Sequence, residues 1–442
     1  MIAIRLACLT LGLIGAGRCL AQNPVIAIEA ARLIDGTGRE PIENAVVLVK
    51  GDKIEAVGRR NEVSIPAGAH VIDLGNDTIL PGLIDAHAHL TVRPDVRGLQ
   101  GQLDGMAQPG GQQVLRGVRN IRTQLLSGVT TLYVVGEMRN NDAYMQEAVQ
   151  AGIIPGPRIL PAGVFITTTA GHGPRESRVT NGPWEMRTLV RRNAENGADH
   201  VKLTITDRLR AGPRYGAMLA KGESNFTREE IQAAVDEAHR LGLKATAHAN
   251  GESIRLALEA GIDSIQHGND LTEELMNLFV KYKKGFVSTY TITFQTFFNE
   301  WGFLDNVAGS NQDWNNHVRD VLVRVRRENA PVETAVRARH KDLLQAHRKG
   351  IPIAVGTDSM SGLLPLEIEN LVEAGFTPLE AITAATGIAS RVLDLSDVGT
   401  IEKGKLADII SVSGNPLQRI RDLTKVNLVM IDGTRRDQIS FR

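Results

Sequence analysis

The sequence predicts an α/β chain: a (β/α)₈, TIM-like barrel with a small β-sandwich domain built from both chain ends. Two patterns and the chain length predict this fold. Over about 320 central residues, short apolar runs alternate with amphipathic helical patterns, which favours a parallel sheet closed into a barrel. The segments before and after this region carry short β runs and tight turns. A length of 442 residues suits one large barrel plus a smaller domain.

The expected sandwich domain comprises residues 24–80 and 398–442, and the expected barrel comprises residues 81–397. Neither group of terminal β runs can bury both of its faces alone, so we expect them to pack together. These runs are Val25–Ile28, Ala45–Val49, Lys53–Val57, Ala407–Val412 and Val426–Ile431.

The barrel strands are expected where apolar runs precede helical patterns. A capping box at Thr227 with Glu230 opens one helix, and Pro378 opens another. Residues 207–225 and roughly 294–330 interrupt the alternation, and we expect them to fold over the barrel mouth as lids. The expected strands are Leu83–His89, Val129–Val135, Arg158–Thr167, His200–Thr206, Lys244–His248, Ser264–His267, Gly285–Thr291 and Ile351–Thr357.

The overall composition argues against several classes of protein. Hydrophobic residues make up 42% and charged residues 23%, as in ordinary globular proteins, which argues against disorder and against an integral membrane protein. Lys plus Arg and Asp plus Glu both number 50, so no basic footprint for nucleic acid or for an anionic membrane is visible. We therefore expect a small-molecule partner and no nucleic acid.

Residues 1–21 predict a signal peptide, because a positive start and a short apolar run lead to a small-residue site, with cleavage after Ala21. A buried N-terminal strand is the alternative, since Arg18 fits poorly in the late part of a signal. Both cysteines, Cys8 and Cys19, lie in this segment, so the mature chain would hold no disulfide and no Cys-ligated metal. We expect an exported protein, periplasmic or secreted.

The first barrel strand ends in a pair of histidines that can bind one metal ion. His87 and His89 are two residues apart on an apolar strand and so project from the same face. Alone, this pair could be an accident of composition. Other polar residues fall in or at the ends of later strands, and such ends meet at one face of a barrel. They are Lys202, His248, His267 and Asp358.

Lys202 lies inside the apolar run Val201–Ile205, where a charge is expensive. A lysine paired with a carboxylate is the ordinary interpretation. Beside four histidines at the barrel mouth, we instead interpret Lys202 as a neutral amine that takes up CO₂. The resulting carbamate, N6-carboxylysine, has two oxygens that can bridge two metal ions.

Together these motifs resemble the amidohydrolase superfamily, specifically its binuclear branch with a carboxylated lysine. Within that branch the chain is similar to prolidase-like, imidazolonepropionase-related hydrolases, whose relatives include Xaa-Pro dipeptidases and ochratoxin-hydrolysing enzymes. The similarity runs from about Ala30 to Asp432. Its segments are Pro81–His89, Gly171–Gly173, His248–Gly251, Gln266–Gly268, Gly356–Ser359, Glu373–Ala381 and Gly399–Asp408.

The resemblance implies two divalent metal ions, for which imidazole and carboxylate ligands suit Zn²⁺. His87, His89 and Asp358 would hold one ion and His248 and His267 the other. Carboxylated Lys202 would bridge them.

Catalytic and substrate-binding residues follow from the same resemblance. Asp358 would move the proton of the attacking water to the leaving amine, and His172 would stabilise the oxyanion or bind substrate. Asn250 stands where relatives commonly have Tyr or His near the substrate carboxylate. Arg139 could meet an anionic substrate or be a surface cation, and Tyr290 could line the pocket or merely pack.

The expected function is hydrolysis of the amide before a C-terminal amino acid, in N-acyl amino acids or dipeptides, with aromatic acyl groups included. The alternatives are a cyclic-amide or lactone hydrolase and a metal-free binding barrel. We expect a homo-oligomer, as in related enzymes. The remaining histidines are expected to be structural or solvated: His70, His200, His239, His317, His340 and His347.

Overall fold

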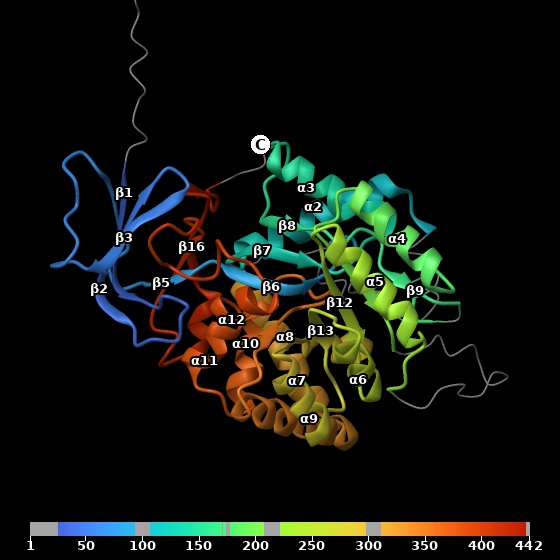
Figure 1. The fold of residues 1–442 in the computed structure, drawn as a ribbon. Helices are drawn as coiled ribbons and strands as arrows, with labels where there is room; N and C mark the ends of the chain where they lie inside the picture. The colour runs from blue at the N-terminus through green and yellow to red at the C-terminus, as the bar shows by residue number, and fades with distance from the viewer. Residues whose placement is uncertain are drawn as a thin grey trace, which may run out of the picture.

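The computed structural model describes residues 25–92, 107–169, 171–173, 177–206, 222–297 and 311–438. A sheet of strands from both chain ends lies beside a larger α/β part, in which helices surround the strands (Figure 1). The expected signal peptide lies outside the described residues, as do 207–221 and 298–310 of the two expected lids. Within the described part of the chain, no helix is long and apolar enough to cross a membrane.

The sheet of the chain ends has the strand order β18-β17-β16-β5-β1-β2-β3, and β4 pairs with β1. Strands β5 and β16 join its two halves, in register from Thr78 opposite Val412 to Pro81 opposite Ile409. Both ends of the chain therefore contribute to one hydrogen-bonded sheet, while the domain limits and the two layers of a sandwich stay predictions. The strands are β1 (Ile26–Leu33), β2 (Ile42–Lys50), β3 (Lys53–Arg59), β4 (His70–Asp73), β5 (Thr78–Pro81), β16 (Ile409–Val412), β17 (Val426–Ile431) and β18 (Thr434–Arg435).

The α/β part holds two parallel sheets, ordered β6-β7-β8 and β10-β9-β11-β12-β13-β14-β15. A parallel bridge between Ala88 and Asp358 connects the end of β6 with the segment after β15. The expected alternation of strand and helix is present, and closure into one eight-stranded ring stays a prediction. The strands are β6 (Leu83–Ala88), β7 (Val129–Val134), β8 (Arg158–Leu160), β9 (Ile166–Thr167), β10 (Arg178–Val179), β11 (His200–Thr204), β12 (Lys244–Ala249), β13 (Ser264–His267), β14 (Gly285–Ser288) and β15 (Ile353–Val355).

The predicted single strand from Arg158 to Thr167 is wrong. The structure has two short strands there, β8 pairing with β7 and β9 pairing with β11. Pro161 has no N–H to donate to a sheet, and Gly163 has a φ of 70°, a conformation outside the β region. Strand β14 also ends earlier than predicted, at Ser288, and a 3₁₀ helix, η2 (Thr291–Phe297), follows.

Helices connect the parallel strands, and the two predicted helix starts are observed. Thr227 with Glu230 and Thr377 with Glu380 both form capping boxes. The helices are α2 (Gly110–Leu126), α3 (Asn141–Gln150), α4 (Pro183–Glu195), α5 (Arg228–Arg240), α6 (Glu252–Glu259), α7 (Glu273–Tyr282), α8 (Asn311–Glu328), α9 (Ala330–Arg348), α10 (Leu364–Glu373), α11 (Pro378–Ala384) and α12 (Gly387–Val392), with the 3₁₀ turns η1 (Met138–Asn140) and η4 (Ile420–Thr424).

Candidate metal centre

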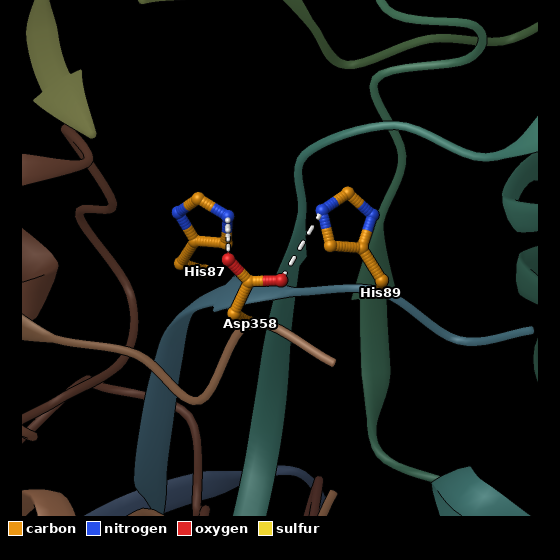
Figure 2. Close-up of side chains that lie close together, drawn as sticks. All are labelled: His87, His89 and Asp358. Carbon is orange, nitrogen blue, oxygen red and sulfur yellow. Dashed lines mark ion pairs between the residues drawn. The ribbon is translucent and has the colours of Figure 1, made fainter. Parts of the chain in front are cut away.

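His87, His89 and Asp358 converge at the ends of β6 and β15 (Figure 2). Nε2 of His87 lies 3.5 Å from Oδ2 of Asp358, and Nε2 of His89 lies 3.8 Å from Oδ1. Backbone pairing fixes this arrangement, because the Asp358 N–H donates to the His87 carbonyl at 2.7 Å and the His89 N–H donates to the Asp358 carbonyl at 3.0 Å. The three possible ligand atoms lie within 4.8 Å of one another, which suits one cation.

The other ring nitrogen of each histidine faces an acceptor. Nδ1 of His87 is 2.7 Å from the Gln266 side-chain oxygen, and Nδ1 of His89 is 2.8 Å from the Gly136 carbonyl. Each Nδ1 therefore donates to its acceptor, and in a neutral imidazole with this tautomer the Nε2 lone pair is directed toward Asp358. Metal-ligating histidines in proteins are oriented in this way, so these residues fit a divalent cation.

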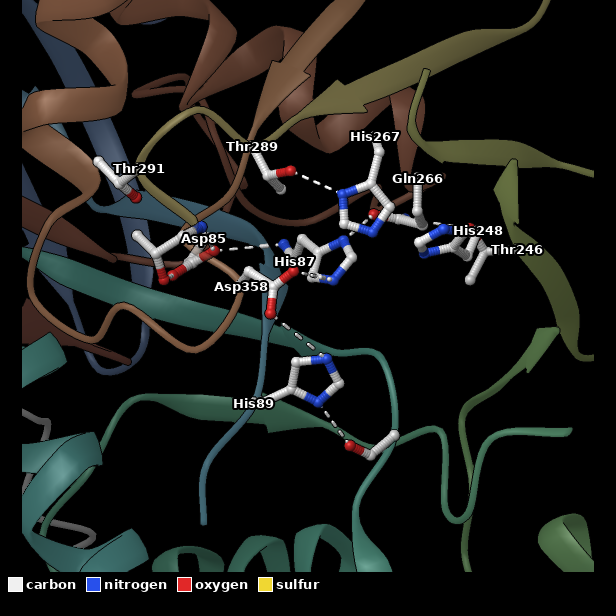
Figure 3. A network of polar contacts seen from close by, with 12 residues as sticks. Asp85, His87, His89, Thr246, His248, Gln266, His267, Thr289, Thr291 and Asp358 are labelled. Atoms are coloured by element: carbon white, nitrogen blue, oxygen red, sulfur yellow. Dashed lines mark hydrogen bonds and ion pairs between the residues drawn. The ribbon is translucent and has the colours of Figure 1, made fainter. Parts of the chain in front are cut away.

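His248 and His267 lie beside this group (Figure 3). The ring centroid of His267 is 4.6 Å from that of His87 and 4.3 Å from that of His248. Nδ1 of His267 contacts the Thr289 hydroxyl at 2.7 Å. Burial lowers the pKa of both His87 and His267 well below the usual range, so both imidazoles are neutral, which is the form that binds metals.

Lys202 is buried in β11, opposite Thr246 of β12. Burial lowers the pKa of its amine to about 7, and the Asp358 carboxylate opposes this shift only in part. No acidic side chain among the described residues lies within ion-pair distance of the Lys202 amine. With this pKa, a large fraction of the Lys202 amine is neutral near pH 7. The neutral amine is the form that reacts with CO₂, so the local environment fits a carbamate.

His172 and Asn250 also lie at this cluster. The His172 ring stacks on His248 with centroids 4.7 Å apart. The Asn250 amide nitrogen donates to Nε2 of His248 at 3.3 Å, and its oxygen accepts from the Asn269 N–H at 3.0 Å. The Asn250 amide is thus bonded to the protein itself, an arrangement that orients His248.

Tyr290 and Arg139 have no described contact with the histidine cluster. Tyr290 is buried in an apolar cluster with Phe294 and Trp314, which matches the packing alternative. Arg139 is exposed and donates to the Gln113 side-chain oxygen at 2.8 Å. Their predicted substrate contacts stay predictions.

Sequence reasoning missed two buried carboxylates that support the site. Asp85 accepts from the Thr357 N–H at 3.0 Å and hydroxyl at 2.6 Å and from the His87 N–H at 3.2 Å, and burial raises its pKa to about 6. Glu137 accepts from the Thr91 N–H at 3.1 Å and from the Leu90 N–H, so it fixes the chain after His89. Both are acidic residues inside or within three residues of an apolar strand, Asp85 in β6 and Glu137 after β7.

Most of the six histidines expected to be structural have partners elsewhere. His239 pairs with Asp263 at 2.8 Å, and His347 pairs with Glu380 at 3.0 Å. His200 stacks on Tyr133 with ring centroids 3.6 Å apart. His340 contacts the Asn370 side-chain oxygen at 2.6 Å. These four contacts agree with a structural role.

Comparisons with known proteins agree with this geometry. The Amidohydrolase family model matches residues 78–436. Ochratoxinase of Aspergillus niger is 26% identical over 441 residues, covering 90% of this chain and 83% of that protein. A crystal structure of a Xaa-Pro dipeptidase with bound methionine is 29% identical, with a TM-score of 0.74 over 93% of this chain and 99% of that one. The crystal structure of A. niger ochratoxinase shares the fold, with a TM-score of 0.75 at 24% identity over 94% of this chain and 96% of that one. The chain therefore belongs to the amidohydrolase family and is a hydrolase of amide bonds.

Proposed function

We propose that this chain is a binuclear, metal-dependent amidohydrolase that cleaves the amide before a C-terminal amino acid, in N-acyl amino acids or dipeptides. The observation that carries the proposal is the convergence of four buried or half-buried histidines, Asp358 and an amine with a lowered pKa at the ends of parallel strands. The similarity to ochratoxinase and to a Xaa-Pro dipeptidase with bound methionine supports this substrate class.

Two groups of ligands are proposed for two divalent ions. His87, His89 and Asp358 would hold one, His248 and His267 the other, and Lys202 would bridge them as a carbamate. Two ions of the Zn²⁺ type would polarise the scissile carbonyl and lower the pKa of the attacking water.

The remaining chemistry belongs to the side chains. An amide nitrogen leaves poorly unless it is protonated, so the Asp358 carboxylate would take a proton from the attacking water and deliver it to that nitrogen. His172, which stacks on His248, would donate a hydrogen bond to the oxyanion as it develops.

Release of free amino acid tests the reaction and the substrate together. The protein would be loaded with Zn²⁺ in the presence of bicarbonate and offered N-acyl amino acids, with aliphatic and aromatic acyl groups, and dipeptides. We expect release of the C-terminal residue, abolished by a chelator. If a protein with two bound metals released nothing but opened cyclic amides or lactones, the substrate proposal would be wrong and the ring-opening alternative would replace it.

Lys202→Ala tests the proposed carbamate. The variant is expected to lose bound metal, because no group remains between the two ligand sets, and to regain part of it when a short carboxylate such as formate is added. Metal content by atomic spectroscopy is the measurement. Lys244→Ala is the matched control, since Lys244 pairs with Asp394 at 2.6 Å and is expected to keep both metals. Full metal content in Lys202→Ala would contradict the carbamate.

We also propose export and self-association. N-terminal sequencing of protein recovered from the periplasm or medium is expected to begin at Gln22, after cleavage at Ala21. Sedimentation is expected to give a mass that is a multiple of the chain mass.

A further inference from the structure

The turn that follows β13 has an unusual backbone. His267 has a φ of 72° and Gly268 a φ of 58°, so two consecutive residues lie in the left-handed region. This region costs free energy for any residue except glycine, and such residues persist where the surrounding structure holds them. A Cβ atom on Gly268 would lie 2.8 Å from Cδ2 of Phe286, so the turn is also packed tightly against β14.

Arg339, on α9, holds this turn through its backbone carbonyls. Its Nη2 donates to the His267 carbonyl at 2.6 Å, and its Nη1 donates to the Gly268 carbonyl. The same Nη2 donates to the Ser288 hydroxyl at 3.3 Å. The guanidinium carbon lies 5.6 Å from the centre of the Phe286 ring. One planar cation thus connects both residues of the turn to the end of β14.

The carboxylates of Asp342, Asp270 and Glu367 act on the guanidinium only from beyond ion-pair distance. Among the described residues, no Asp or Glu forms an ion pair with Arg339. Burial lowers its pKa to about 10, which keeps it charged at neutral pH. A half-buried cation is costly unless its N–H groups are bonded, and here Nη1 and Nη2 donate to the turn and to Ser288.

We propose that Arg339 is a positioning residue for the metal centre, which locks the left-handed turn and thereby aims the imidazole of His267. The ring itself is held at Nδ1 by Thr289, the neighbour of Ser288, so ring and backbone are fixed from adjacent points of one segment. This inference rests on the proposed function, in which His267 is a metal ligand. Lysine is a poor replacement for the arginine, because its donors radiate from one nitrogen and do not reproduce the planar fork that reaches both carbonyls from Nη1 and Nη2.

Metal affinity is the test, with readouts that do not depend on turnover. Arg339→Met and Arg339→Lys would be compared with the wild type by chelator competition and by the absorption spectrum of the Co²⁺-loaded protein. We expect about 10–100-fold weaker binding of one of the two ions and a changed Co²⁺ spectrum in both variants, as for other residues that support ligands. If the Arg339→Met variant does not fold, the metal affinity and Co²⁺ spectrum of Arg339→Lys alone test the positioning role.

Arg326→Met is the matched control. Arg326 is also half-buried, lies on the neighbouring helix α8, and donates to Glu333 at 2.7 Å and to Glu373 at 2.8 Å rather than to the turn. It is expected to lower the unfolding temperature and to keep the wild-type metal affinity and spectrum.

The outcomes separate the two proposals. A wild-type protein that binds no metal would overturn the proposed function, and the role of Arg339 with it. A wild type that binds two ions, with unchanged affinity and spectrum in Arg339→Lys, would overturn the role of Arg339 alone.

Discussion

Asp358 is held from both sides of its backbone while its side chain stays available. Its N–H and its carbonyl pair with His87 and His89, and its φ of 59° turns the carboxylate toward both Nε2 atoms. A carboxylate held in this way can bind a cation with one oxygen and exchange a proton at the other.

Asp358→Asn separates these two roles. The amide oxygen can still act as a ligand, but the side chain no longer accepts a proton, so we expect kcat to fall by about 10²–10⁴-fold while most of the metal is retained. Turnover and metal content would be measured on the same preparation. Asp236→Asn, at a half-exposed residue paired with Arg187, is the control and should behave as the wild type. Wild-type turnover in Asp358→Asn would remove Asp358 from the proton path.

The sequence predicted four histidines and Asp358 at strand ends and Lys202 inside an apolar strand, while their roles as metal ligands stay predictions. It did not predict Gln266 or Thr289, which orient the rings of His87 and His267. Amide and hydroxyl side chains form no recognisable sequence pattern. Whether such a side chain reaches a histidine ring depends on the register between strands β12, β13 and β14. The side-chain environment of Tyr290 was equally out of reach, because it depends on how α8 packs.

At the scale of elements, β6 and the segment after β15 approach each other closely at Gly356. A Cβ atom there would lie 2.5 Å from both the Cβ and the backbone nitrogen of His87. Asp85 connects the same two segments through Thr357. The arrangement of His87, His89 and Asp358 therefore depends on Gly356, which is not itself a proposed metal ligand.

Gly356→Ala is expected to force these segments apart, at a cost of about 3 kcal/mol, and to lower metal affinity. Urea unfolding and chelator competition would measure the two effects. Gly111→Ala, in α2, is the control, because a Cβ there meets nothing within 4 Å. It should keep or slightly raise stability. An unchanged unfolding midpoint in Gly356→Ala would contradict the close approach.

The packing of α4 against α5 should depend on pH through Glu237. Its buried carboxylate accepts from Arg191 at 2.8 Å and from Arg240 at 3.1 Å, and these bonds lower its pKa from 4.5 to about 2. A lowered folded-state pKa gives stability that is complete above pH 4.5 and is lost as the pH falls toward 2. Glu237→Gln should therefore lower the unfolding temperature clearly at pH 7 and less at pH 3. An equal difference at both values would exclude the charge as the cause.

The order of strands and helices along the barrel region could be predicted from the sequence, but the residues at which they begin and end could not. Apolar runs identify buried strands, but β8 and β9 were merged because the break at Pro161 and Gly163 lies inside an apolar stretch. Joint packing of the two chain ends was expected from their similar character, whereas β5 was not among the predicted β runs and its pairing with β16 follows only from tertiary contacts.

At the scale of the whole molecule, Arg158 connects the α/β part to the sheet of the chain ends. From β8 it donates to Asp408 at 3.0 Å and to Asp432 at 2.8 Å, next to β16 and β17. Asp408 is buried, so the loss of this cation would leave a carboxylate without its main partner.

Arg158→Met is expected to lower stability by about 3 kcal/mol, and the added change Asp408→Asn should restore part of that loss. Urea unfolding of the two single variants and the double variant gives the coupling. The exposed pair Arg327 and Glu328 provides a control, since Arg327→Met should change stability by less than about 1 kcal/mol. Additive effects at Arg158 and Asp408 would show that the Arg158–Asp408 pair contributes nothing to stability.

The pairing of β5 with β16 also sets an order of events during synthesis. Pro81 leaves the ribosome roughly 330 residues before Ile409, its partner in the sheet. At roughly 5–20 residues per second this interval is on the order of tens of seconds. Throughout it, the nascent chain carries an open strand edge at β5, which its own C-terminal segment covers only once translation is nearly complete.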